Sequence, residues 1–133
     1  MTDKLPIPEL LAPAGSEESL RAALAGGADA VYFGAASFNA RRNAENFTDE
    51  GFIGAVRYCR ERGVKVYLTL NTMPREYEYP ALEEYFEKLK DIRVDALIIG
   101  DIGVLMLAKK MLPDTEIHIS TQANSVSAAD CLA

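Results

Sequence analysis

Short apolar runs alternate with longer amphipathic segments along the chain. Five runs have the length and composition of β-strands, and they span residues 9–14, 29–34, 65–71, 95–101 and 116–121. The segments between them repeat their apolar positions every three to four residues, which is typical of helices packed on one side. Regular alternation of strand and helix predicts a parallel sheet with right-handed crossover connections.

Four helices are predicted from the residues at their ends. Capping and terminating residues delimit them: Ser16 and Gly26–Gly27 for the first, Thr48 and Gly63 for the second, Pro80 as the first residue of the third, and Pro113 after the fourth. In the second helix, Phe52, Ile53, Val56 and Cys59 are expected to face the core. Each helix therefore lies between two strands.

The strand patterns favour a barrel over an open sheet. In residues 65–71, apolar Val66, Leu68 and Leu70 alternate with Tyr67, Thr69 and Asn71, and residues 116–121 alternate in the same way. Central strands of open parallel sheets are covered by helices on both faces, whereas barrel strands are covered on the outside only. The first turn, APAGS, also lacks the G-x-G-x-x-G pattern of dinucleotide-binding sheets.

The inner face of such a barrel follows from the same alternation. We assign to it five large side chains: Leu11, Tyr32, Tyr67, Leu97 and Ile99. Five strands are too few to close a barrel, so this face and both edge strands would stay uncovered. The chain is therefore expected to self-associate as a homodimer, or to flatten into an open α/β sheet.

Composition limits the environment and the partners of this segment. Twenty acidic and 14 basic residues give a net charge of −6, which argues against a nucleic-acid-binding surface here. No apolar run approaches the roughly 18 residues of a membrane span, and the first residues lack a signal-peptide pattern. Cys59 and Cys131 have no metal-ligand spacing. We expect a cytoplasmic protein with reduced thiols and no metal site in this segment.

Five motifs resemble one known family in order and spacing. They are PELLAPAGS, GADAVYFGA, VYLTLNT, DALIIGDIGVL and IHISTQAN, within residues 7–124. Together they are similar to the N-terminal part of the collagenase-like peptidases, unassigned peptidase family thirty-two. Ile102 replaces a frequent Pro, Glu45 replaces a frequent Gly, and residues 124–133 diverge from the usual continuation.

The resemblance implies an α/β fold, a TIM-barrel-like domain of which residues 1–133 form a single N-terminal portion. That portion would hold the first five strands and four helices. The family includes proteins described as collagenases and proteases, prephenate-dependent RNA hydroxylation proteins and oxygen-independent ubiquinone hydroxylases. It also implies an iron–sulfur cluster bound by cysteines downstream of this segment, and no cofactor within the segment itself.

Candidate substrate-binding residues lie on or near the strands. They are Glu9, Arg41, Asn71, Asp101, His118 and Gln122. In barrels of this class the active site lies at the carboxyl ends of the strands. Asn71 and Gln122 follow strands where packing requires no amide, and Arg41 matches an arginine of the family pattern that could bind a carboxylate with both nitrogens.

Several of these candidates also have a structural explanation. Glu9 is either a ligand or an inward carboxylate paired with a lysine or arginine of the barrel. Asp101 could cap the fourth helix. His118 is either a general base or a hydrogen-bonded residue within the barrel, and Arg41 could be a solvated loop charge.

Two classes of function remain open. One is an enzyme that, at full length, acts on a peptide, an RNA or a small carboxylate, either as a peptidase (hydrolase) or by hydroxylation. The other is a non-catalytic half-barrel with a binding or assembly role. No serine-hydrolase elbow and no H-E-x-x-H motif occurs, so the residues themselves give no support to a protease mechanism.

Overall fold

Five parallel strands form one sheet in the order β1-β2-β3-β4-β5. The computed structural model describes residues 5–34 and 48–132. The strands are β1 (Leu11–Pro13), β2 (Ala30–Gly34), β3 (Lys65–Leu70), β4 (Ala96–Ile99) and β5 (Glu116–Ile119). Each neighbouring pair is parallel, which confirms the predicted sheet, and each strand is shorter than the run that predicted it.

The helices follow the strands in the predicted alternation. They are α1 (Glu17–Ala25), α2 (Asp49–Glu61), α3 (Tyr79–Ile92), α4 (Ile102–Met111) and the short α5 (Ala128–Leu132), with 3₁₀ turns η1 (Glu76–Glu78) and η2 (Thr121–Ala123). The side chains of Ser16 and Thr48 cap α1 and α2 as predicted. Helix α3 begins at Tyr79, one residue before Pro80, because η1 leads directly into it and proline is tolerated in a first turn.

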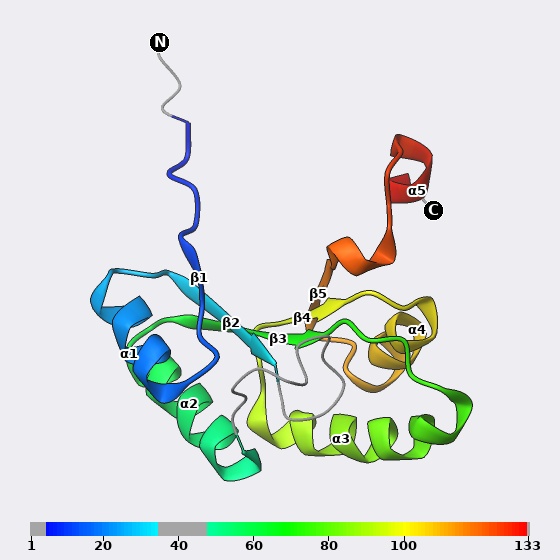
Figure 1. Ribbon diagram of the computed structural model, residues 1–133, viewed down its shortest axis with the longest axis horizontal. Helices are drawn as coiled ribbons and strands as arrows, with labels where there is room; N and C mark the ends of the chain where they lie inside the picture. Colours follow the sequence, from blue (N-terminus) through cyan, green and yellow to red (C-terminus); the bar gives the residue numbers. More distant parts are fainter. Residues whose placement is uncertain (1–4, 35–47, 133) are drawn as a thin grey trace.

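Helices α1 to α4 cover one face of the sheet only, below the strands in Figure 1. The core lies between these layers and includes Val31, Phe33, Val66 and Leu68 from the strands and Leu20, Val56, Leu82, Phe86 and Val104 from the helices. This one-sided cover is the arrangement of a barrel wall, with helices on the outside.

Two assignments to faces are wrong. Leu97 and Ile99 are buried in the helix-covered core instead of the inner face, because they pair in register with Leu68 and Leu70. The prediction placed this strand one residue out of phase, which moves every side chain to the other face. Ile53 is exposed, because it lies beside the helical stripe of α2 that faces the sheet.

The opposite face of the sheet, here called the inner face, has its own small apolar layer. Ala30, Tyr67 and Ala96 are buried there, with Tyr32 and Ile98 packed against them. Leu11 pairs in register with Ala30 and lies on the same face, 42% exposed. The predicted inner positions of Leu11, Tyr32 and Tyr67 are therefore confirmed.

Candidate functional site

Polar residues from three strands meet at the carboxyl edge of the sheet. Asn71 follows β3, Gly100 and Asp101 follow β4, and Ser120 and Gln122 follow β5. A Cβ atom added to Gly100 would lie 3.0 Å from Cβ of Gln122 and 3.3 Å from the backbone oxygen of Asn71. The two amide residues therefore flank one glycine. We call Asn71, Gly100, Asp101, Ser120 and Gln122 the rim cluster.

Ser120 links the two amide residues of the rim cluster. Its hydroxyl oxygen accepts a hydrogen bond from Asn71 Nδ2 at 3.4 Å and one from the backbone N–H of Gln122 at 3.2 Å. Ser120 is buried, with 8% of its surface exposed, whereas Gln122 is exposed. Sequence reasoning missed this role of Ser120, although a serine directly after a strand is a common local cap.

One carboxylate oxygen of Asp101 accepts two hydrogen bonds. Its Oδ1 accepts from the backbone N–H of Val104 at 2.9 Å and from the Tyr79 hydroxyl at 3.4 Å. The predicted capping role is confirmed. Burial and the neighbouring Asp101 carboxylate raise the pKa of the Tyr79 phenol above its ordinary value.

Gly103 makes room for the Tyr79 hydroxyl. A Cβ atom at Gly103 would overlap that oxygen, so no larger residue fits without moving Tyr79. Neither Tyr79 nor Gly103 was a candidate site residue in the sequence analysis. The signal that could have found them is Gly103 itself, because a glycine inside a helix often marks the close approach of another group. Arg41, another predicted site residue, lies outside the described residues.

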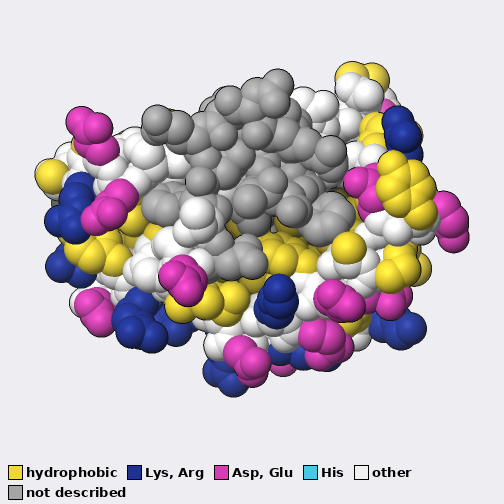
Figure 2. Space-filling view, turned by 60° about the horizontal axis from the view of Figure 1, so that its bottom comes forward, with side chains coloured by type: hydrophobic (Ala, Val, Ile, Leu, Met, Phe, Trp, Pro, Cys, Tyr) yellow, Lys and Arg dark blue, Asp and Glu magenta, His cyan; other side chains and the backbone are white. Residues whose placement is uncertain are grey.

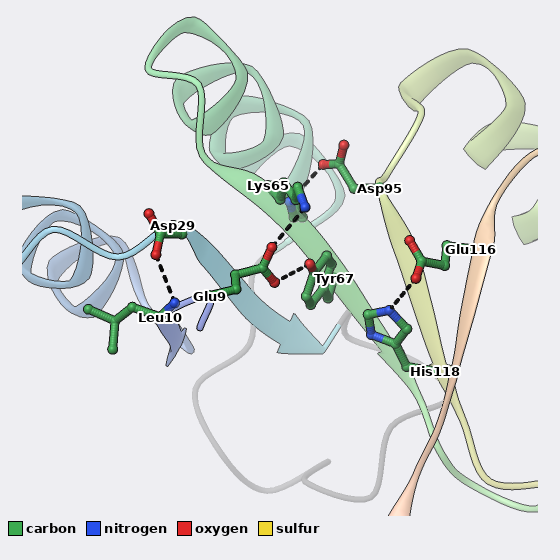
Figure 3. Close-up of polar contacts among 9 residues, drawn as sticks. Glu9, Leu10, Asp29, Lys65, Tyr67, Asp95, Glu116 and His118 are labelled. Atoms are coloured by element: carbon green, nitrogen blue, oxygen red, sulfur yellow. Dashed lines mark hydrogen bonds and ion pairs between the residues drawn. The ribbon is translucent and has the colours of Figure 1, made fainter. Parts of the chain in front are cut away.

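Glu9 and His118 belong to a different group of side chains, drawn in Figure 3. The Glu9 carboxylate accepts hydrogen bonds from Lys65 Nζ at 2.8 Å and from the Tyr67 hydroxyl. The rings of Tyr67 and His118 meet edge to face with centroids 4.7 Å apart, and His118 Nε2 lies 3.2 Å from Glu116 Oε1. We call these five residues the inner-face cluster.

Most of the inner-face cluster lies toward the amino ends of the strands, whereas His118 is the third of the four residues of β5. Lys65 and Glu116 are the first residues of β3 and β5, and Glu9 precedes β1. Glu9 thus lies at the opposite end of the strands from the rim cluster, and the His118 ring contacts Tyr67 and Glu116 on the inner face. The alternative in which Glu9 pairs with a barrel lysine is confirmed. Polar groups at the amino face of a barrel usually serve stability, because catalysis occurs at the other face.

The pKa values of this cluster reflect its contacts. Hydrogen bonds from Lys65 and Tyr67 lower the pKa of Glu9, and the Glu9 carboxylate raises the pKa of Lys65. Burial, reinforced by the hydrogen bond to Glu9, raises the pKa of Tyr67 to about 12. Glu9 is thus stabilised as an anion between two donors from β3.

Replacing Glu9 by Gln is expected to destabilise the chain only within a pH window. A carboxyl whose folded pKa is lowered stabilises the fold above its ordinary pKa of 4.5, and this contribution disappears as the pH falls through the folded value. A lysine whose folded pKa is raised contributes below its ordinary 10.5 and ceases to do so at higher pH. Urea unfolding of wild type and variant from about pH 3 to about pH 11 measures the window.

Glu17→Gln is the matched control for Glu9→Gln. Glu17 forms an exposed ion pair with Arg21 at 2.6 Å within one helix, and such pairs contribute little to stability. A stability difference between wild type and Glu9→Gln that is the same at every pH would show that the Glu9–Lys65 ion pair does not stabilise the fold.

The two cysteines do not fit an iron–sulfur cluster. Cys59, a residue of α2, is fully buried in the core, and burial raises the pKa of its thiol to about 11. Cys131 is exposed in α5, on the other side of the sheet from the helices (Figure 1). Residues 5–34 and 48–132 contain no group of three or more His, Cys, Asp or Glu side chains placed to hold a metal ion.

No helix of the described part of the chain is long and apolar enough to cross a membrane.

A half-barrel wall with polar residues at its carboxyl edge defines the chain as part of a TIM-barrel-like α/β protein. Solved structures agree: a U32 peptidase and a hydroxymethylglutaryl-CoA lyase from Pseudomonas aeruginosa both superpose with a TM-score of 0.63. The chain is 13% and 18% identical to them, over 90% and 87% of its length and 50% and 45% of theirs. These similarities concern the fold alone.

The chain belongs to Peptidase family U32, which matches residues 15–132. It is 42% identical over 123 residues to a tRNA hydroxylation protein P from Helicobacter pylori and 39% identical over 125 residues to a collagenase from Porphyromonas gingivalis. It is also 38% identical over 116 residues to a 23S rRNA 5-hydroxycytidine synthase from Escherichia coli. These matches cover 92%, 93% and 87% of the chain but only 29%, 30% and 17% of the relatives.

Proposed function

We propose that the rim cluster is part of the substrate site of an enzyme that hydroxylates RNA with a small carboxylate co-substrate. The observation that carries this proposal is the convergence of Asn71 and Gln122 on Gly100 at the carboxyl edge. Relatives named for tRNA hydroxylation and 5-hydroxycytidine synthesis support this choice of reaction.

The amide side chains suit such a substrate. The exposed Gln122 side chain has two N–H donors and one carbonyl acceptor, which can bind a carboxylate or the edge of a nucleobase, and Asn71 brings a second amide whose Nδ2 also donates to Ser120. Arg41 follows β2 in the sequence and is expected to add a bidentate contact to the carboxylate. Asp101, held by Val104 and Tyr79, supplies a negative charge at the same edge.

A serine-peptidase mechanism has less support at this edge. His118 contacts Glu116 and Tyr67 on the inner face, and its Nε2 lies 3.2 Å from Glu116 Oε1 (Figure 3). The Ser120 hydroxyl accepts hydrogen bonds from Asn71 and from the backbone of Gln122. A serine nucleophile needs a histidine base within hydrogen-bond reach, itself oriented by a third group.

Alanine at Asn71 or Gln122 in the intact protein is expected to lower hydroxylation about ten-fold or more. The reason is the loss of a hydrogen bond to a charged group, about 1.5–3 kcal/mol each. The measurement is mass spectrometry of nucleosides from a deletion strain complemented with each variant. Thr121→Ala, at an exposed residue of the same 3₁₀ turn, is the control and should leave the modification unchanged.

Two results would contradict this proposal. Full hydroxylation in both variants and in Arg41→Ala would overturn the rim site. Cleavage of gelatin or casein by the purified protein, lost in Ser120→Ala, would instead assign a peptidase activity to this edge.

A further inference from the structure

Four large apolar side chains are exposed on the two segments that follow the rim residues Asn71 and Asp101. Met73 and Tyr77 lie between β3 and α3, and they are 67% and 72% exposed. Ile102 and Met106 lie one turn apart on the same side of α4, and they are 79% and 62% exposed. We call these four residues the corner patch.

Tyr79 joins the two halves of the corner patch. It directly follows η1, and its hydroxyl reaches Asp101 and the position of Gly103 at the start of α4. The turn that carries Tyr77 and the first turn of α4 that carries Ile102 are therefore held together. Arg75 donates a hydrogen bond to the Tyr77 hydroxyl at 3.4 Å, which further restrains the exposed ring.

Acidic side chains border the half of the corner patch that precedes and begins α3, whereas Lys109 and Lys110 follow Met106 in α4. Residues 73–84 contain the carboxylates of Glu76, Glu78, Glu83 and Glu84 and a single basic residue, Arg75. Glu76 and Asp101 are both close enough to raise the pKa of Tyr79. At the end of the molecule where α3 begins, Figure 2 shows hydrophobic side chains flanked by acidic ones. Exposed Tyr and Met are typical of interaction surfaces.

We propose that the corner patch is a docking site for a basic protein segment in which apolar anchors alternate with lysine or arginine. The apolar anchors would cover Tyr77, Met73, Ile102 and Met106, and the basic residues would meet the carboxylates of Glu76 and its neighbours. The same carboxylates repel phosphates, which makes an RNA strand the less suitable occupant. This inference is independent of the function proposed for the rim cluster.

The size of the corner patch sets the binding affinity that is expected for the partner segment. Four exposed side chains correspond to a small interface of the transient kind, and such interfaces commonly bind with affinities on the order of micromolar. Binding should weaken with added salt, because its ionic part is exposed and screened.

Short dye-labelled peptides test the proposal by fluorescence anisotropy with the intact protein. A peptide of alternating Leu and Lys should bind about ten-fold or more tightly than a matched peptide of alternating Leu and Glu. Tyr77→Ala should weaken the Leu/Lys peptide about ten-fold, as expected for an anchoring aromatic residue, and Glu76→Lys should reduce the preference for the basic peptide. Val126→Ala removes an exposed apolar residue elsewhere and should have no effect.

Three results would overturn the docking site. The first is equal binding of the two peptides, and the second is unchanged affinity in Tyr77→Ala and Glu76→Lys. The third is tighter binding of a single-stranded RNA oligonucleotide that Tyr77→Ala weakens, which would assign the patch to nucleic acid. Circular dichroism of each variant verifies that the fold is retained.

Discussion

Replacing Gly100 by Val is expected to abolish the proposed activity, with a loss of about 100-fold or more. The added Cβ would lie 3.0 Å from Cβ of Gln122 and 3.3 Å from the backbone oxygen of Asn71. Neither neighbour is the far end of a flexible side chain, so β3 and η2 must separate at this edge. A displacement of about 1 Å at a site can cost two orders of magnitude in rate.

Gly54→Ala is the matched control for Gly100→Val. Gly54 lies inside α2, and a Cβ there would meet no atom within 4 Å. Alanine should therefore leave activity unchanged and stabilise the helix by about 0.5–1 kcal/mol. Nucleoside analysis of complemented deletion strains gives the activities, and urea unfolding gives the stabilities. Full activity in Gly100→Val would show that Asn71 and Gln122 do not act together.

The 133-residue chain by itself is expected to self-associate. Among the described residues, β1 pairs only with β2 and β5 only with β4, so both edges present unpaired backbone groups. Part of the inner face is also exposed: Leu11 is 42% exposed and the side chain of His118 is 35% exposed. A second copy that covers this face would remove apolar surface from water, at about 25 cal/mol per Å².

Light scattering measures this association directly. The expected mass is at least twice the 14.5 kDa of one chain. Leu11→Lys places a charge on the inner face of the edge strand and should shift the chain toward monomer, since charged residues protect sheet edges. Leu5→Lys, at an exposed position before β1, is the control and should not change the mass. A stable wild-type monomer would contradict the prediction.

The order of the elements, their capping residues and the family follow from the sequence alone. Ser16, Thr48 and Asp101 were identified as caps because a cap bonds to backbone groups only two or three residues away. The parallel sheet could also be predicted from the sequence, because strands and helices alternate and short connections leave few possible topologies. The placing of Asn71 and Gln122 at one edge followed from the rule that parallel strands end together.

Only the tertiary structure decided which side chains share a face of the sheet, because this depends on the register between strands that are distant in sequence. It moved Leu97 and Ile99 to the helix-covered core, and it paired Glu9 with Lys65 on the inner face. It also brought Tyr79 onto Asp101 through the space left by Gly103. A side-chain period of two makes the face of a strand sensitive to a shift of one residue, and only pairing with a neighbour determines that shift.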